Sequence, residues 1–229
     1  MEPIVSIVIP VYNEAATIAA TIGNIHAAKG GQHQLEIIVV DGGSTDGTLD
    51  VARAHGAIGV RSERKGRATQ MNLGASVASG EILYFLHADT IPPLGFDVQL
   101  TAACDHGTVG GCFRLAFDYH HWFLKANCWF TRFNINAFRF GDQSLFVTRA
   151  VFCKSGGFRE DLLVMEDQEI IHRIKRYGRF SVLEDSVITS ARKYLTHGIF
   201  RTQGVFYLVW MLYYLGAPQE RLVNMLRRL

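Results

Sequence analysis

Strands and helices alternate along the first 86 residues, and this alternation limits the folds open to the chain. The predicted elements are strands at 4–12, 35–41, 58–61 and 81–86, and helices at 13–28, about 45–55 and 67–79. Strands that alternate with helices of this length form βαβ units, which build parallel sheets covered by helices. The sequence therefore predicts an α/β fold with a single Rossmann-like, mostly parallel sheet flanked by helices.

Composition narrows the class of protein. The chain has 229 residues, of which 48% are hydrophobic and 19% charged, as in a globular protein. We predict a large domain at 1–197 and a C-terminal helical extension at 198–229. The formal net charge of +2 is too small to favour nucleic acid as the main partner. The four cysteines include no CxxC pair, and no apolar leader opens the chain, so we expect reduced thiols in a cytoplasmic protein.

Polar residues stand where the predicted strands end. Tyr12-Asn13-Glu14 follow the first strand, Asp41-Gly42-Gly43 end the second, and His87-Ala88-Asp89 follow the strand at 81–86. In parallel α/β sheets, ligands bind beyond the carboxyl ends of the strands. The three stretches are therefore predicted to form one binding site at one edge of the sheet.

The stretch DGGSTDGT (41–48) suits a tight turn from strand to helix. Its glycines would take positive φ, and one of residues 44–46 would cap the helix. That turn does not require Asp41, whose carboxylate can accept a hydrogen bond from a base N–H. A P-loop is excluded because Thr48-Leu49 stand where Lys and Ser/Thr are needed. A dinucleotide-binding fingerprint is excluded because no GxGxxG follows either early strand.

The stretch RSERKGRATQMNLGA (61–75) has two interpretations. In one, Arg64, Lys65 or Arg67 contacts a diphosphate, a common use of a guanidinium fork or an ammonium group. In the other, it is a solvated basic loop before an amphipathic helix. The inward residues of that helix are predicted to be Ala68, Met71, Ala75 and Ala78.

Five stretches, in this order, resemble the family 2 glycosyltransferases, which have the glycosyltransferase A fold. They are PVYNE (10–14), DGGSTDGT (41–48), GRATQMNLGA (66–75), HAD (87–89) and MEDQE (165–169). The similarity covers roughly residues 4–195. The motifs GDQS (141–144), GGFRE (156–160) and TSARKY (189–194) look like those of a small bacterial branch of that family.

The resemblance implies an inverting enzyme that moves one sugar from a nucleotide-diphosphate sugar, with a UDP-sugar expected, to an acceptor hydroxyl. The acceptor is unknown, and a lipid or a small molecule would fit. Processive synthases of the family carry a QxxRW element and membrane spans, and the sequence shows neither, so a single transfer is expected. The substrate-binding residues implied by the resemblance are Pro10, Tyr12, Glu14, Asp41, Gly43, Arg67, Gln70, Asn72, His87, Ala88, Gln143 and Arg192.

The family holds a divalent cation against the donor's diphosphate with an Asp-x-Asp element. Asp89 stands at its last position, whereas His87 replaces the first aspartate. Mn²⁺ or Mg²⁺ is the implied cofactor, since these hard ions favour carboxylate and phosphate oxygens. His197 is a further candidate ligand. The alternative is that Asp89 only caps the turn into Pro92-Pro93.

By the same resemblance, Asp167 is the general base and Glu166 lies beside it near the acceptor. Both fall in the first turn of a helix predicted for MEDQEIIHRIKRYG (165–178), with Ile170, Ile171, Ile174 and Tyr177 inward. Acidic residues also stabilise the start of a helix electrostatically, which is the purely structural interpretation.

The C-terminal region has an apolar run at 204–217 and a basic amphipathic segment at 218–229. The run is shorter than the roughly 20 residues that span a bilayer. It predicts either a helical hairpin that closes the acceptor side or a peripheral contact through 199–229 with the inner face of the membrane. A second hypothesis for the whole chain, suggested by His87, is a catalytically silent nucleotide-sugar-binding or scaffolding protein on the same fold.

Overall fold

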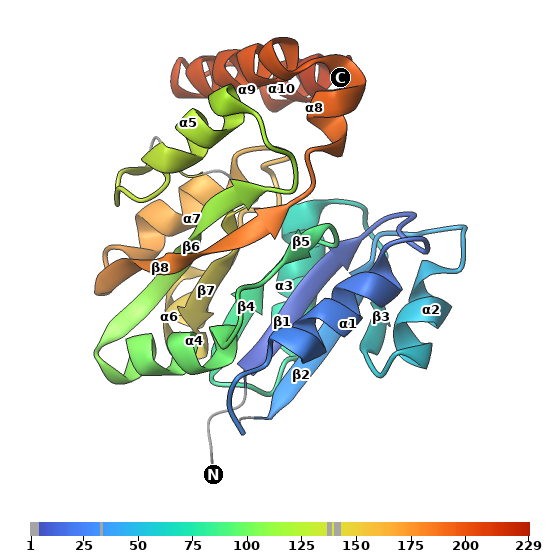
Figure 1. The fold of residues 1–229 in the computed structure, drawn as a ribbon, viewed down its shortest axis with the longest axis vertical. Helices are drawn as coiled ribbons and strands as arrows, with labels where there is room; N and C mark the ends of the chain where they lie inside the picture. Colours follow the sequence, from blue (N-terminus) through green and yellow to red (C-terminus); the bar gives the residue numbers. More distant parts are fainter. Residues whose placement is uncertain (1–4, 33, 137–138, 140–142) are drawn as a thin grey trace.

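A computed structural model of the protein describes residues 5–32, 34–136, 139 and 143–229. Within these residues, helices surround an eight-stranded sheet with the strand order β3-β2-β1-β4-β7-β6-β8-β5 (Figure 1). The strands are β1 Val5–Val11, β2 Leu35–Asp41, β3 Ile58–Arg61, β4 Ile82–Phe85, β5 Thr90–Ile91, β6 Thr108–Phe117, β7 Leu145–Thr148 and β8 Arg179–Thr189. The helices are α1 Ile18–Ala28, α2 Thr48–Ala54, α3 Arg67–Val77, α4 Phe96–Asp105, α5 Trp122–Phe130, α6 Arg149–Ser155, α7 Glu166–Ile174, α8 Arg192–His197, α9 Ile199–Tyr214 and α10 Gln219–Leu226.

The mostly parallel sheet is confirmed, and its parallel part holds the strands predicted from the sequence. β3, β2, β1 and β4 pair in parallel. β7 then pairs antiparallel with both β4 and β6, whereas β6 and β8 are again parallel. The short β5 pairs antiparallel with β8 at Thr90↔Thr189. This last pairing brings the segment after β4 beside the segment after β8.

The core lies on both faces of the sheet, which explains the continuous apolar runs in the early strands. On one face, Ile7 and Ile9 of β1 pack with Ile22 of α1. On the other face, Val8 packs with the α3 residues that the sequence predicted to point inward. Those buried residues are Ala68, Met71, Ala75 and, just past the helix, Ala78.

Gly74 sets how closely α3 approaches the sheet. A Cβ atom added there would lie 2.3 Å from Val8 Cγ1 and 3.0 Å from Val40 Cγ2. Alanine in a helix normally adds about 0.5–1 kcal/mol of stability over glycine, but overpacking a core costs about 1–3 kcal/mol of stability.

We expect Gly74→Ala to lower the free energy of unfolding by about 1 kcal/mol or more in denaturant titration. The matched control is Gly23→Ala in α1, where the added Cβ meets nothing within 4 Å and the same change should stabilise. Equal stabilisation by both substitutions would contradict the close packing.

Several predicted boundaries were wrong for local reasons. α1 begins at Ile18 and not at 13, because Asn13 takes φ 54° and bonds residues 44 and 45 of the neighbouring turn. Gly47 is the N-cap of α2, although the Asp46 carboxylate accepts the Thr48 N–H at 3.1 Å. α7 ends at Ile174, so Tyr177 lies beyond it and is 46% exposed, not inward.

The predicted C-terminal helical pair is present as α9 and α10, which lie together at one end of the molecule (Figure 1). Among the described helices, none combines the length and the apolar composition needed to cross a bilayer. The domain boundary at 197/198 stays a prediction; it falls between α8 and α9.

Candidate active site

A pocket of about 400 Å³ lies where the starts of α3 and α7 meet the end of β8 and the C-terminal helical pair. Strand pairing and helix docking thus bring together segments that are up to 159 residues apart in sequence. The lining residues are Arg67, Asp89, Arg139, Leu163, Val164, Met165, Glu166, Asp167, Gln168, Thr189, Ser190, Arg192, Lys193, Tyr194, Phe206, Val209, Trp210 and Leu226.

Arg67 and Glu166 form an ion pair on the polar side of the pocket. Arg67 Nη1 lies 3.5 Å from Glu166 Oε1, and the Glu166 side chain is only 3% exposed. A carboxylate so buried needs a partner cation, because its desolvation is costly. Arg67, at the first position of α3, supplies that charge while a large part of its own side chain stays accessible to a ligand. Of the three cations left open by the sequence, Arg67 is the one that lines this pocket.

Asp89 reaches the pocket through the pairing of β5 with β8. Its backbone carbonyl accepts the N–H of Ser190 at 3.2 Å. Ser190 lies in the short loop between β8 and α8. Arg192, in the first turn of α8, lines the same pocket and lies 3.9 Å from Glu14 through Nη2 and Oε1. A carboxylate and a guanidinium from distant segments therefore face one cavity.

Asp167 is presented by a helix start that the rest of the chain holds in place. Met165, immediately before α7, has φ 68°, a left-handed conformation that costs a non-glycine residue about 1 kcal/mol or more. Gln219 Oε1 accepts the N–H groups of Leu163 and Val164 at 3.0 and 3.1 Å. Gln168 is bonded to the Arg139 carbonyl at 2.6 Å. These contacts maintain the turn that orients Glu166 and Asp167 towards the pocket.

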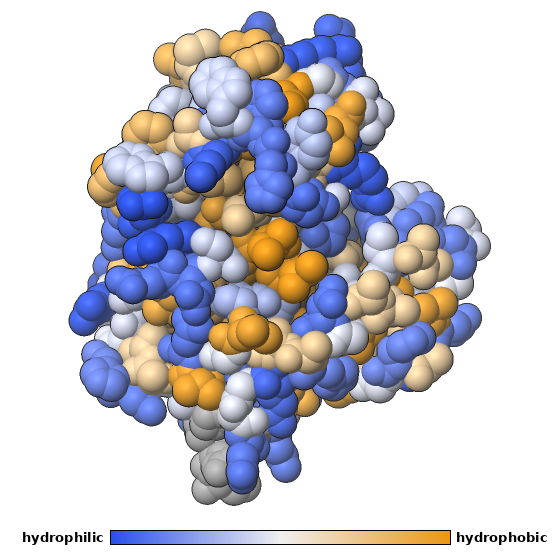
Figure 2. All heavy atoms as spheres, in the orientation of Figure 1, coloured by the Kyte–Doolittle hydropathy of each residue, from blue (hydrophilic) through white to orange (hydrophobic). Residues whose placement is uncertain are grey.

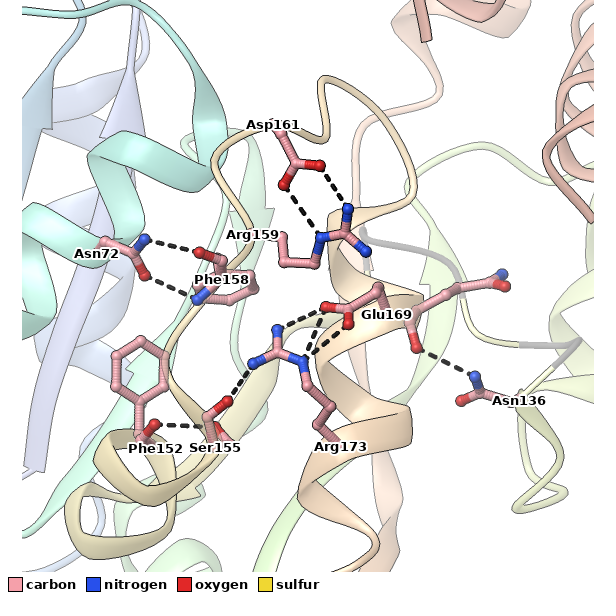
Figure 3. Close-up of polar contacts among 10 residues, drawn as sticks. Asn72, Asn136, Phe152, Ser155, Phe158, Arg159, Asp161, Glu169 and Arg173 are labelled. Carbon is pink, nitrogen blue, oxygen red and sulfur yellow. Dashed lines mark hydrogen bonds and ion pairs between the residues drawn. The ribbon is translucent and has the colours of Figure 1, made fainter. Parts of the chain in front are cut away.

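Further along, the other side of α7 is fixed to the segment before it. Arg173 lies between the Glu169 carboxylate and the Ser155 carbonyl, and Asn72 faces the backbone of Phe158 (Figure 3). The Asn72 side chain donates to the Phe158 carbonyl and accepts its N–H, each at 2.8 Å. The loop from α6 to α7 is thereby tied to α3.

A second group of predicted residues meets at the ends of β1 and β2. Lys65 Nζ lies 3.2 Å from the Tyr12 hydroxyl and 4.4 Å from the centre of its ring. Gly43, with φ 94°, lies beside the Lys65 side chain. Asp41 is buried, and one carboxylate oxygen accepts both the N–H and the hydroxyl of Ser44. That oxygen is occupied within the turn, so the predicted contact of Asp41 with a base stays a prediction.

Two of the remaining predicted binding residues, Gln70 and Gln143, hydrogen-bond to backbone carbonyls of the protein. Gln70 Nε2 donates to the carbonyls of Val11 and Val40, at 2.9 and 2.8 Å, and so joins the ends of β1 and β2. Gln143 is buried and donates to the Phe113 carbonyl at 3.2 Å. Pro10 lies within β1, Ala88 is buried and His87 is half-buried. None of these five, nor Asn72, is among the described pocket-lining residues, and their donor contacts stay predictions.

Arg139 is a pocket residue that the sequence interpretation missed. Its side chain is buried, and its guanidinium donates to the carbonyls of Thr131 and Phe133. Burial lowers the pKa of Arg139 from its usual range and raises the pKa of the adjacent Cys112 thiol to about 11. No motif marked Arg139, since its role depends on loop carbonyls rather than on spacing along the chain.

The carboxylate of Asp89 fits a divalent cation that is coordinated partly by the protein and partly by a bound ligand. Within the described part of the chain, no three His, Cys, Asp or Glu side chains gather as a complete metal-binding set. Asp89 lines the pocket, whereas His197 ends α8 and is not one of the described lining residues. A Mg²⁺ or Mn²⁺ ion commonly uses one or two carboxylates and completes its coordination with substrate phosphates and water. Asp89 meets that requirement; the predicted contribution of His197 stays a prediction.

Comparison with known proteins identifies relatives of known class. Glycosyltransferase AglE of Haloferax volcanii is 36% identical over 96 residues, 39% of this chain and 32% of that protein. A PGL/p-HBAD biosynthesis glycosyltransferase of Mycobacterium bovis is 39% identical over 93 residues, 38% of this chain and 36% of that protein. The chain thus matches about a third of the length of these relatives.

Solved structures share the fold at low sequence identity. The mannosyltransferase PcManGT of Pyrobaculum calidifontis, in complex with GDP-Man and Mn²⁺, has a TM-score of 0.73 and 20% identity, covering 98% of this chain and 69% of that one. TarS 1–349 of S. aureus with UDP has a TM-score of 0.70 and 17% identity, covering 83% of this chain and 60% of that one. The model of the family described as "Glycosyl transferase family 2" matches residues 6–163, well over half of the chain. With this match and a fold shared with glycosyltransferases, the chain belongs to glycosyl transferase family 2.

Proposed function

We propose that the protein is an inverting glycosyltransferase that moves a single sugar from a UDP-sugar to an acceptor hydroxyl. The observation that carries the proposal is the pocket itself. It places two cations that suit a diphosphate, Arg67 and Arg192, in one cavity with two carboxylates, Asp89 and Asp167. A diphosphate and a reacting hydroxyl require these two kinds of group.

In the proposed reaction, Asp167 accepts the proton of the acceptor hydroxyl as that oxygen attacks the anomeric carbon. The new C–O bond forms while the bond to the phosphate oxygen breaks on the opposite face. The electron pair leaves with the nucleoside diphosphate, and the anomeric configuration inverts. Glu166 is bound to Arg67, so its carboxylate orients that cation rather than serving as the base.

Arg67 and Arg192 would bind the diphosphate and stabilise the charge that develops on it. Asp89, together with phosphate oxygens of the donor, would hold a divalent cation, which supplies further positive charge to the leaving group. Two structural neighbours, the mannosyltransferase and a glucosyl-3-phosphoglycerate synthase of Mycobacterium tuberculosis, were solved with Mn²⁺ and a nucleotide or nucleotide sugar.

The pocket also has an apolar wall, which suits an acceptor that carries an apolar part. The helices of the C-terminal pair form most of this wall. Its residues are Leu163, Val164, Phe206, Val209, Trp210 and Leu226. This arrangement supports the first alternative for residues 204–229, in which the pair closes the acceptor side.

A hydrolysis screen of nucleotide sugars, with and without Mn²⁺, tests the proposed function. We expect slow release of UDP from one UDP-sugar in the presence of Mn²⁺, because water can replace the acceptor. If a nucleotide sugar binds in calorimetry but is never hydrolysed or transferred to any acceptor tested, the chain is the silent binding protein.

Substitution of Arg67 tests the assignment of the diphosphate cation. Hydrogen bonds to charged groups contribute about 1.5–3 kcal/mol, so Arg67→Met should weaken UDP binding roughly tenfold or more by calorimetry. Arg64→Met is the matched control, because Arg64 pairs with Glu160 outside the pocket. Arg67→Met also leaves Glu166 without this partner, so Arg67→Met/Glu166→Gln separates lost binding from lost stability. If Arg64→Met alone weakens UDP binding, the diphosphate lies elsewhere.

A further inference from the structure

α9 is apolar on both of its faces. Towards the domain, Phe206, Val209 and Trp210 line the pocket. The opposite side of the helix has a second stripe of large side chains at spacings of three and four residues. These exposed residues are Phe200, Tyr207, Leu208, Met211 and, at the end of the helix, Leu215. A helix that is apolar all round is normally buried on every side, in a core or in lipid.

α5 carries a matching stripe. Trp122 is 69% exposed, Trp129 and Phe130 follow it in the last turn of the helix with large exposed areas, and the exposed Phe133 lies just beyond the helix. Lys125 lies on the same exposed side, and the Arg132 guanidinium lies 4.6 Å from the centre of the Trp129 ring. The residues therefore combine aromatic rings with cations, as at the interface of a bilayer, where rings lie at headgroup level and cations meet phosphate.

The stripes of α5 and α9 form one surface. The ring centres of Trp122 and Phe200 are 6.3 Å apart, although Phe200 is itself 59% exposed, and the Tyr207 hydroxyl donates to the Asn127 side chain. We call this the aromatic surface and define it by its exposed members on the two helices. Figure 2 shows hydrophobic residues at the molecular surface among hydrophilic ones at the end where Figure 1 places α9 and α10.

The charge of the chain is strongly asymmetric. Residues 119–136 and 192–229, which include α5, α9 and α10, contain eight Lys and Arg and one Glu. The whole chain has 23 Lys and Arg and 21 Asp and Glu, so the rest of the chain has 15 Lys and Arg and 20 Asp and Glu. The end that carries the aromatic surface thus has a formal charge of +7, whereas the remainder has −5. A net charge of +2 conceals this division.

From the aromatic surface and this charge, we propose that the α5–α9 end of the protein docks peripherally on an anionic bilayer. Exposed Trp, Phe and Tyr side chains would enter the interface, and the surrounding Lys and Arg would contact anionic headgroups. A second copy of the chain is a poorer occupant, because two ends that each carry an excess of Lys and Arg would face each other. The inference does not depend on glycosyl transfer, since lipid binding needs neither donor nor acceptor.

Vesicle sedimentation of the full chain tests this docking. We expect the protein to pellet with vesicles of phosphatidylcholine and phosphatidylglycerol, weakly with phosphatidylcholine alone, and less as salt rises. Each Arg removed near an anionic surface should weaken partitioning about fivefold, so Arg227→Gln/Arg228→Gln should bind markedly less than Arg53→Gln, its control on α2. Trp122→Ser/Leu215→Ser should reduce binding at least tenfold, whereas Leu94→Ser, at a 79% exposed residue before α4, should not.

Two results would overturn the docking surface. The first is absence of binding to anionic vesicles by the unmodified protein. The second is equal binding by Trp122→Ser/Leu215→Ser and the unmodified protein, with both folded by circular dichroism. A concentration-dependent dimer that this double substitution abolishes, without any vesicle binding, would show instead that the aromatic surface joins two copies of the chain.

Discussion

Asp167→Asn is expected to lower the rate of sugar transfer by about two orders of magnitude or more while leaving donor affinity unchanged. The amide keeps the shape of the carboxylate but cannot take the proton of the acceptor hydroxyl, and such proton transfer contributes about 10²–10⁴-fold. Because the interaction is needed in the transition state, kcat should fall rather than KM rise. Donor Kd, melting temperature and kcat should be measured on one preparation.

The competing structural role of Asp167 has a matched control. Asp50 lies in the first turn of α2 and, like Asp167, places a carboxylate at a helix start, but it is not among the described pocket residues. Removal of either charge should cost at most about 1 kcal/mol of stability through the helix dipole. Near-normal kcat in Asp167→Asn would assign Asp167 to helix stabilisation. The search for a base would then turn to Glu166 and to Asp142, which lies outside the described residues.

Asp89→Ala should abolish the part of donor binding that depends on a divalent cation. Among the described carboxylates of the pocket, Asp89 is the one that follows β4, at the position the family uses for the cation. Without this carboxylate, the ion would be bound by the phosphate oxygens of the donor but by no ligand from the protein. Calorimetry of UDP with Mn²⁺ and with a chelator should show two different affinities for the unmodified protein. The variant should show one, equal to the affinity measured with chelator.

Asp89→Asn serves as the shape-conserving comparison, and Asp185→Ala as a control for loss of a surface carboxylate. Asp185 lies on β8 and bonds Gln99, outside the pocket. An unchanged difference between Mn²⁺ and chelator in Asp89→Ala would show that the cation, if used, is held by other groups.

The parallel half of the sheet could be predicted because its signals are local. Each of β1, β2 and β4 is a short apolar run followed by polar residues, and α3 has its apolar residues at helical spacing. The antiparallel part could not be predicted in this way. β7 joins β4 to β6 by pairings such as Tyr84↔Phe146 and Gly111↔Phe146, and nothing in either segment alone specifies its partner.

In the candidate site, too, local motifs could be predicted, whereas contacts that form only in the folded chain could not. Motif resemblance named Arg67, Asp89, Glu166, Asp167 and Arg192, which the structure brings to one pocket. It also named amides such as Gln70 and Asn72, whose hydrogen bonds go to other groups of the protein. A motif does not distinguish a residue that touches a ligand from one that supports the loop beside it. The apolar wall was not assigned residue by residue, because it forms only when α9 and α10 fold back over α7.

Gln219 links α10 to the segment just before α7 through two hydrogen bonds, from the backbone N–H groups of Leu163 and Val164. The left-handed Met165 comes next, and Asp167 follows two residues later. A shift of α10 by more than about an ångström must therefore either break both bonds, which tolerate little stretching, or move the start of α7 with it. The position of Asp167 is therefore mechanically coupled to the C-terminal helical pair, because only two residues separate Asp167 from Val164, the nearer of the two bonded residues.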